Sequence, residues 1–155
     1  MGRDRARAEK LADHLHHRLG IEAVAGPDAA ALREAAIICT VTNARAPLFE
    51  TGDVHPQVHI NAIGAYRPDM CELPAALLKD AAIFADSKIP VAREAGDLLA
   101  AFGSPEAVAV RLRAIGELIA APLASRPKGR TVYKAVGNAG QDLYAAAAIL
   151  KLLDA

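Results

Sequence analysis

Two segments of the sequence carry glycines and polar residues where parallel sheets bind ligands. Residues 59–73 (HINAIGAYRPDMCEL) begin as a β-branched strand and continue into a polar loop, and residues 131–143 (TVYKAVGNAGQDL) join a strand to a helix through two glycines. Open α/β sheets bind ligands beyond the carboxyl ends of their strands. Glycine allows close approach of the backbone, and a helix N-terminus favours negative charge. Both segments are candidate binding loops, and both also fit ordinary turns.

Histidine and cysteine are the other residues that could do chemistry. His14 and His17 share a helical face with His16 nearby, which suggests a metal site. No carboxylate or cysteine completes a ligand set there, so a solvated helix face is the favoured interpretation. Cys39 lies in an apolar run and is expected to be a small core residue. Cys71 lies in a loop without a neighbouring base, and two cysteines cannot form a disulfide framework.

Hydrophobic periodicity predicts the elements that would position these loops. The predicted strands cover residues 21–24, 36–41, 58–63, 82–86 and 131–136, and the run at 36–41 is typical of a strand buried on both faces. The predicted helices cover residues 5–19, 27–34, 73–79, 91–102, 105–119 and 139–153, with Asp4 capping the first and Gly20 ending it. This alternation predicts an α/β fold, a parallel sheet with helices on both faces.

Composition excludes several classes of protein. The 155 residues include 18 basic and 18 acidic side chains, so a binder of nucleic acid that depends on excess positive charge is excluded. A content of 53% hydrophobic and 23% charged residues is typical of a folded chain. We see no signal peptide and no apolar run of about 20 residues for a membrane span, and we expect a cytoplasmic protein.

The predicted alternation begins with a helix, and residues 1–3 alone represent a strand before it. Dinucleotide folds open with a strand, a G-x-G-x-x-G turn and a helix that holds the pyrophosphate. This sequence contains no such glycine cluster. We therefore expect residues 1–155 to form a partial Rossmann-like domain that lacks the first strand–helix unit. A sheet without its first strand is expected to have bare edges, with Val41, Ile60 and Ile63 partly exposed.

Four segments occur in one order that resembles the ornithine cyclodeaminase and mu-crystallin family: residues 38–44 (ICTVTNA), 59–73, 94–98 (EAGDL) and 131–143. The resemblance covers essentially the whole chain. It implies an NAD(P)-dependent enzyme, homodimeric when full-length, that acts on a small amino acid or cyclic imine. Reduction of a ketimine such as pyrroline-2-carboxylate is one such activity. It also implies that the C-terminal segment returns toward a substrate and dimerisation domain outside this chain.

The resemblance also implies a set of cofactor contacts. They match Gly2, Arg3, Asp4, Thr42, Ile60, Asn61, Ala62, Ile63, Ala135, Val136 and Gly137, the last three beside the nicotinamide and substrate. Arg3 stands where an acidic residue would favour the ribose of NAD, so NADP is expected over NAD.

Three positions depart from the family pattern. Tyr66 replaces an aspartate, Met70 replaces a lysine, and Ala135 replaces a frequent serine. Tyrosine side chains, with an ordinary pKa of about 10, are poor general bases at neutral pH. The catalytic residues are therefore unknown, and Tyr66 argues against ornithine cyclodeaminase.

Three functional hypotheses remain. The first is the cofactor-binding portion of an NAD(P)-dependent reductase or dehydrogenase for a small imine or amino acid. The second is ornithine cyclodeaminase, which converts ornithine to proline and ammonia. The third is a non-catalytic binding or oligomerisation module. The family's substrate-gripping residues match nothing in this sequence, so the isolated chain is expected to be inactive and to bind a dinucleotide poorly.

Overall fold

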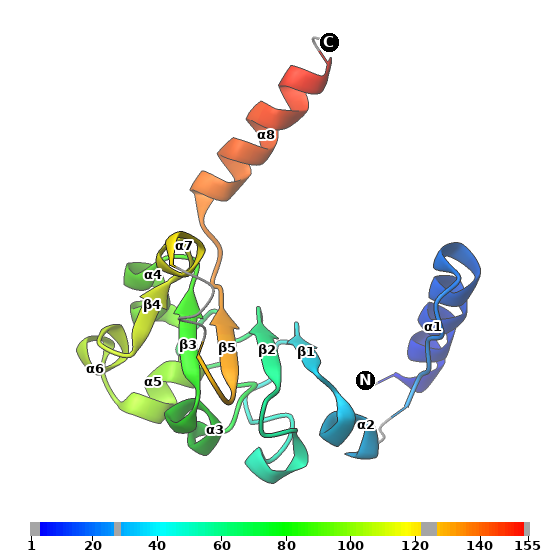
Figure 1. Ribbon diagram of the computed structural model, residues 1–155, viewed down its shortest axis with the longest axis horizontal. Helices are drawn as coiled ribbons and strands as arrows, with labels where there is room; N and C mark the ends of the chain where they lie inside the picture. The colour runs from blue at the N-terminus through cyan, green and yellow to red at the C-terminus, as the bar shows by residue number, and fades with distance from the viewer. Residues whose placement is uncertain (1–3, 27–28, 122–126, 154–155) are drawn as a thin grey trace.

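The computed structural model describes residues 4–26, 29–121 and 127–153, and its centre is a five-stranded parallel sheet (Figure 1). The strands are β1 Ile37–Thr40, β2 His59–Ala62, β3 Ala82–Ala85, β4 Leu112–Ala114 and β5 Thr131–Lys134. Their order across the sheet is β1-β2-β5-β3-β4, and every pair is parallel. The predicted α/β fold with a parallel sheet is confirmed.

The last strand along the chain, β5, lies between β2 and β3. Asn61 of β2 is opposite Tyr133, and Ile83 of β3 is opposite Val132. The loops that follow β2 and β5 are far apart in the sequence, yet they leave the sheet side by side. This insertion is what brings the two candidate binding loops to one edge.

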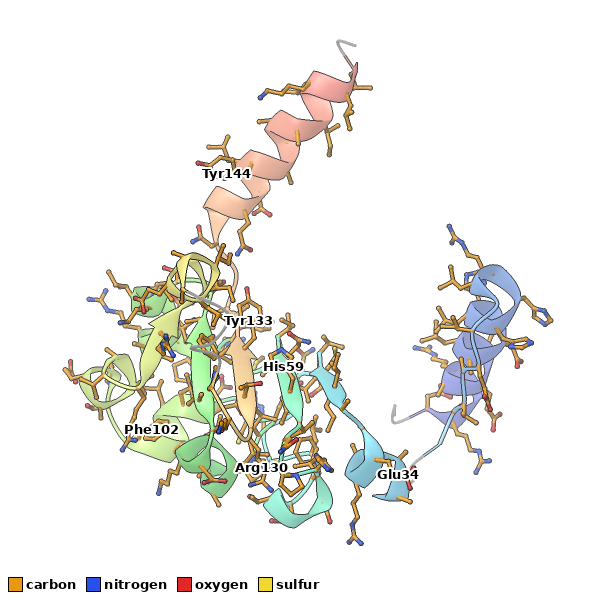
Figure 2. All side chains as sticks on the ribbon, viewed as in Figure 1. Glu34, His59, Phe102, Arg130, Tyr133 and Tyr144 are labelled. Carbon is orange, nitrogen blue, oxygen red and sulfur yellow. The ribbon has the colours of Figure 1, made fainter. Side chains whose placement is uncertain are left out.

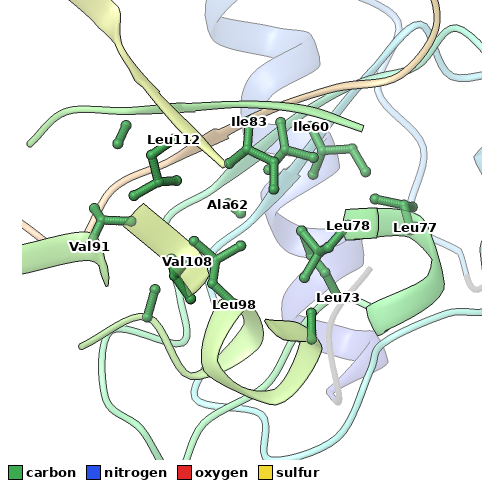
Figure 3. Packing of buried hydrophobic residues seen from close by; sticks show 14 of the residues in the cluster. Ile60, Ala62, Leu73, Leu77, Leu78, Ile83, Val91, Leu98, Val108 and Leu112 are labelled. Carbon is green, nitrogen blue, oxygen red and sulfur yellow. The ribbon is translucent and has the colours of Figure 1, made fainter. Parts of the chain in front are cut away.

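Helices cover the two faces of the sheet unequally. One face packs against α3 (Ala75–Asp80), α4 (Lys88–Glu94), α5 (Gly96–Phe102) and α6 (Pro105–Ala109), while α7 (Ile115–Ala120) borders a hollow on the opposite face. Alternate residues of the strands, such as Ile60 and Ile83, point into the core between sheet and helices, where they join Leu77, Leu98 and Val108 (Figure 3). Full burial of such a side chain contributes about 1.5–3 kcal/mol, so this layer stabilises the sheet that carries the loops.

Two long helices stand away from the sheet (Figure 1). Helix α1 (Arg5–Leu19) begins as predicted at Asp4, whose side chain accepts the Arg7 amide, and ends at Gly20, where φ is 65°. Helix α8 spans Ala139–Leu153, also as predicted. Neither helix has a buried residue. A short helix, α2 (Ala29–Glu34), packs beside the 3-10 turn η1 (Thr51–Asp53).

Three predicted elements are wrong. Residues 91–102 form two helices that meet at Ala95, because the backbone there is extended. Residues 105–119 form α6, β4 and α7, since Leu112 pairs with Ile83 and extends the sheet. Residues 21–24 form no strand, because no described strand pairs with them. Periodicity alone does not detect such breaks and edge pairings.

Strand β1 is buried on one face only, which corrects the prediction of burial on both. Ile38 and Thr40 face the core, whereas Ile37 is 64% exposed and Cys39 is also exposed. Cys39 is therefore not a core residue. The reason is that β1 is the edge strand of the described sheet and no described helix covers its second face.

Within the described ranges, no helix combines the length and apolarity needed to cross a membrane.

Candidate functional site

The loops that follow β1, β2 and β5 leave the sheet together at the carboxyl ends of the strands, because these three strands are parallel neighbours. The amides of Ile63 and Gly64 both donate to the Thr40 carbonyl, at 2.9 and 3.2 Å. The Ala135 amide donates to the Ala62 carbonyl at 3.2 Å. The candidate binding loops therefore meet at the carboxyl edge, the place where α/β sheets bind ligands.

A buried carboxylate holds the loop that follows β1. Oε1 of Glu72, a residue with no exposed surface, accepts the Thr42 amide at 2.5 Å. The Thr42 hydroxyl accepts the Ala44 amide at 3.1 Å, which leaves the hydroxyl proton able to donate. Thr42, a predicted cofactor contact, is thus held at this edge.

A second buried carboxylate joins helix α5 to the end of β5. Oδ1 of Asp97 accepts the amides of Glu72 and Leu73 at 2.5 and 3.0 Å, and Oδ2 lies 3.4 Å from Nζ of Lys134. Lys134 is completely buried, and its ammonium also donates to the Gly64 carbonyl. Burial lowers the pKa of Lys134, and the Asp97 carboxylate offsets part of that effect.

Sequence reasoning missed this cluster. Lys134 lies two residues after the buried Val132, and residues two apart in a strand face the same side. The sequence could therefore have indicated that this lysine points into the core. Asp97 belongs to the EAGDL segment, which had no physical explanation. The structure explains two of its residues. A Cβ on Gly96 would collide with the carbonyl oxygens of Met70 and Arg67, and Asp97 binds the amides described above.

The loop after β2 contains an unusual backbone conformation. Ala65 has φ of +52°, the only positive φ at a non-glycine position among the described residues. L-residues with side chains rarely adopt this left-handed region, and such strain is concentrated at functional sites. Tyr66, which follows, is 43% exposed, whereas Met70 is buried. The aspartate position of the family is thus presented to solvent here, and the lysine position is not.

The other predicted cofactor contacts occupy different environments. Ile60 and Ala62 are fully buried in the core, so the expectation that Ile60 is exposed is wrong. Asn61 points to the opposite face, where it borders the hollow. Gly2 and Arg3 lie outside the described residues, and Asp4 caps α1.

The described residues fit one end of a nicotinamide cofactor. The amides of Val136 and Gly137 donate no hydrogen bond within the described part of the chain, and Ile63 on the neighbouring loop is 42% exposed. Free amides beside an aliphatic side chain suit a carboxamide and a flat ring. The N-terminus of α8 is already capped, since Asn138 accepts the Gly140 amide at 2.8 Å. These donors and this apolar side chain have the chemistry that a nicotinamide requires, and the described residues include no glycine-rich turn for a pyrophosphate.

A hollow of about 1010 Å³ lies on the sheet face opposite the core. Figure 2 shows His59 and Tyr133 on adjacent strands of this face. Nδ1 of His59 lies 2.7 Å from the Thr131 hydroxyl, and Nε2 lies 3.3 Å from Asn61 Oδ1. Burial raises the pKa of Tyr133. His59 thus bonds both to β5, through Thr131, and to Asn61 on its own strand.

The histidines of α1 and the second cysteine add no site. No described group of three histidine, cysteine or acidic residues is arranged to hold a metal ion, and His16 Nδ1 lies 3.0 Å from the Ile21 carbonyl. Burial, with help from the Asp97 charge, raises the pKa of Cys71 to about 11. A thiol with so high a pKa is almost entirely protonated at neutral pH and is a poor nucleophile.

A family model described as "Ornithine cyclodeaminase/mu-crystallin family" matches residues 1–153. Ketimine reductase mu-crystallin of Rattus norvegicus is 34% identical over 149 residues, covering 93% of this chain and 43% of the rat protein. Delta(1)-pyrroline-2-carboxylate reductase of Bacillus cereus is 34% identical over 150 residues, covering 93% of this chain and 46% of that protein. The chain thus spans less than half the length of these relatives.

A solved structure shares the arrangement described above. An archaeal alanine dehydrogenase dimer with bound NAD superposes with a TM-score of 0.77 at 30% sequence identity. The match covers 92% of this chain and 44% of the dehydrogenase chain. The similarity therefore includes nearly every element described here.

Proposed function

This chain belongs to the ornithine cyclodeaminase/mu-crystallin family, and we propose that it forms the nicotinamide-binding part of an NAD(P)-dependent reductase. The proposed substrate is a small cyclic imine (ketimine) or amino acid. One observation carries the proposal: the loops after β1, β2 and β5 converge at one sheet edge in a chain 34% identical to two imine reductases.

The cofactor would supply a hydride for the substrate carbon, and the protein would bind and orient both partners. The free amides of Val136 and Gly137 would hold the carboxamide, and Ile63 would lie against the ring. The Thr42 hydroxyl would donate a hydrogen bond to the cofactor from the adjacent loop. The Glu72 carboxylate holds the loop with Thr42, and backbone hydrogen bonds of Ile63 and Ala135 hold the starts of the other two loops.

Tyr66 favours imine reduction over ornithine cyclodeamination. Cyclodeamination needs a base near the reacting amine at neutral pH, and a tyrosine hydroxyl holds its proton there. Tyr66 is accessible at 43% exposure and can donate a hydrogen bond to a bound substrate. A hydrogen-bond donor suits the carboxylate or imine nitrogen of a cyclic imine.

We propose NADP as the preferred cofactor, with NAD as the alternative. Arg3 is the last of the three residues that represent a strand before the first predicted helix, where a guanidinium can pair with a 2′-phosphate through charge-assisted hydrogen bonds. The archaeal neighbour binds NAD, so the preference depends on this arginine rather than on the fold.

We also propose that residues 1–155 act as one partial Rossmann domain within a homodimer. Helix α8 exposes large apolar side chains, among them Tyr144 at 81% (Figure 2). Large exposed apolar surfaces mark protein contacts. We propose that α8 packs against a substrate and dimerisation domain, in keeping with the dimeric archaeal neighbour.

Titration of the isotope-labelled chain with NADPH, followed by amide NMR, tests the proposed binding site. We expect shifts at Thr42, Ile63, Val136 and Gly137, with a dissociation constant of about a millimolar because the pyrophosphate lacks its glycine turn. Residues of α3 on the core face serve as the internal control. Shifts confined to the opposite sheet face, around His59, would contradict this location.

A further inference from the structure

The turn formed by residues 64–66 is strained and buried at its centre. Ala65 is completely buried and holds φ at +52°, a conformation that glycine adopts easily and alanine does not. Strained residues of this kind persist only where surrounding contacts hold them in place. The contacts that hold Ala65 therefore decide how Tyr66 is presented.

Three hydrogen bonds hold the turn from three different elements. The Gly64 amide donates to the Thr40 carbonyl at the end of β1 at 3.2 Å. The Gly64 carbonyl accepts the Lys134 ammonium from the end of β5. The Ala65 carbonyl accepts the Gly96 amide, where α5 begins, at 3.2 Å. Two of these bonds use backbone groups, and only the bond from Lys134 depends on a side chain.

The position of the Lys134 ammonium is itself fixed. Nζ lies 3.4 Å from Asp97 Oδ2, and the other oxygen of Asp97 accepts the amides of Glu72 and Leu73. All of these polar groups are buried, where electrostatic attraction is weakly screened. Asp97 therefore holds the lysine against the Gly64 carbonyl.

We propose that Lys134 is a positioning residue whose ammonium holds the strained Ala65 turn and thereby fixes Tyr66 at the substrate edge. Lys134 does not touch substrate or cofactor; it acts through the Gly64 carbonyl. Its effect on the turn is independent of any activity, whereas its effect on catalysis rests on the proposed reductase function.

A purely structural role of Lys134 would differ from a positioning role in how the turn responds to substitution. If Lys134 only neutralised Asp97, removing both charges together would leave the turn unchanged. If Lys134 holds the turn, the same double change would loosen Tyr66, and Ala65→Gly would reverse the loosening because glycine needs no support at positive φ. The double change Lys134→Met with Asp97→Asn also avoids leaving the charge of either residue buried without the other.

A tryptophan reporter makes the test direct, because the sequence contains no tryptophan. In the Tyr66→Trp background, we expect Lys134→Met/Asp97→Asn to raise the acrylamide quenching constant of the indole about twofold, as a loosened turn opens to solvent. Adding Ala65→Gly returns the constant to its starting value. The matched control is Arg130→Met/Asp80→Asn, which removes the pair between the largely buried Arg130 and the exposed Asp80 at the opposite end of β5 and leaves quenching unchanged.

Unchanged quenching in a folded double variant would overturn the proposal, as would an equal rise in the control. If the double variant fails to fold, hydrogen exchange of the unsubstituted chain tests whether Lys134 holds the turn. The ammonium protons of Lys134 must then exchange slowly with solvent, and exchange as fast as at the exposed Lys10 overturns the proposal. In a preparation that reduces imines, the double variant with Tyr66 intact lowers kcat about tenfold with a smaller change in cofactor KM. A complete lack of activity in the unsubstituted protein counts against the proposed function alone, since the quenching test needs no catalysis.

Discussion

The ammonium of Lys134 lies 3.4 Å from Oδ2 of Asp97, and neither side chain is exposed to solvent. The pair joins the first turn of α5 to the last residue of β5, next to the loops that we assign to the nicotinamide. Removal of one partner from a buried pair leaves an uncompensated charge, which costs more than the pair itself contributes. The buried pair therefore makes the sheet edge sensitive to single substitutions.

Asp97→Ala should destabilise the chain by about 3–5 kcal/mol. The Lys134 charge would stay buried without its partner, and two backbone amides would lose their acceptor. Asp97→Asn should cost less, since an amide oxygen still accepts those amides. Urea unfolding measures both. The control is Asp69→Ala, which removes exposed pairs with Arg45 and Arg67 and should cost at most about 1 kcal/mol. Equal losses at Asp97 and Asp69 would contradict the buried pair.

Cys71 should make the folded state less stable in alkali. Its pKa is raised from 9.0 to about 11 on folding, so the folded state keeps a proton that the unfolded state releases. Stability that is fully present below pH 9 is therefore lost as the pH rises through about 11. Urea unfolding from pH 8 to 11 compares the wild type with Cys71→Ala. The wild type should lose more stability over this range, and parallel curves would show that folding does not raise the pKa of the thiol.

Several local features could be predicted from the sequence because a nearby residue determines them. The capping of α1 by Asp4 and its end at Gly20 are examples, since cap residues act within one turn. Strands β1, β2, β3 and β5 were found from their apolar runs. Strand β4 was not, because its three residues are defined by pairing with β3 rather than by their own pattern.

The site was predictable in location and less so in contacts. Chain order placed the loops after β2 and β5 beyond strand ends, but only the pairing of β5 with β2 makes them neighbours. Val41 and Ile63 are exposed as expected, although only Val41 follows the edge strand β1, whereas Ile60 faces the helices of the core. The buried lysine and aspartate come from distant elements, so no spacing along the chain reveals their contact.

Gly64→Ala and Gly96→Ala should each destabilise the chain by about 1–3 kcal/mol or more, because a new Cβ has no room. At Gly64 it would collide with the Glu72 carboxylate and the Thr42 carbonyl, and at Gly96 with two backbone carbonyls. The matched control is Gly52→Ala, where no atom lies within 4 Å of the added carbon. Thermal unfolding measures the loss of stability in each of the three variants. A cost at Gly52 as large as at Gly64 would rule out crowding as the cause.

Arg3→Ala should lower the preference for NADPH over NADH in an active preparation, because alanine cannot pair with the 2′-phosphate. The measurement is kcat/KM for each cofactor with the unsubstituted and substituted proteins. Loss of one charge-assisted pair is expected to change the ratio about tenfold or more. Arg5→Ala is the control, since Arg5 pairs with Glu9 on α1. A wild type that prefers NADH would refute the assignment of Arg3.

Imine reduction is the activity that we propose for this protein. The most direct measurement compares two rates in one preparation, NADPH oxidation with pyrroline-2-carboxylate and proline release from ornithine with NAD. We expect imine reduction to exceed ornithine conversion about a hundredfold or more, because Tyr66 cannot act as the base that cyclodeamination needs. Comparable rates, or proline release without imine reduction, would contradict the account.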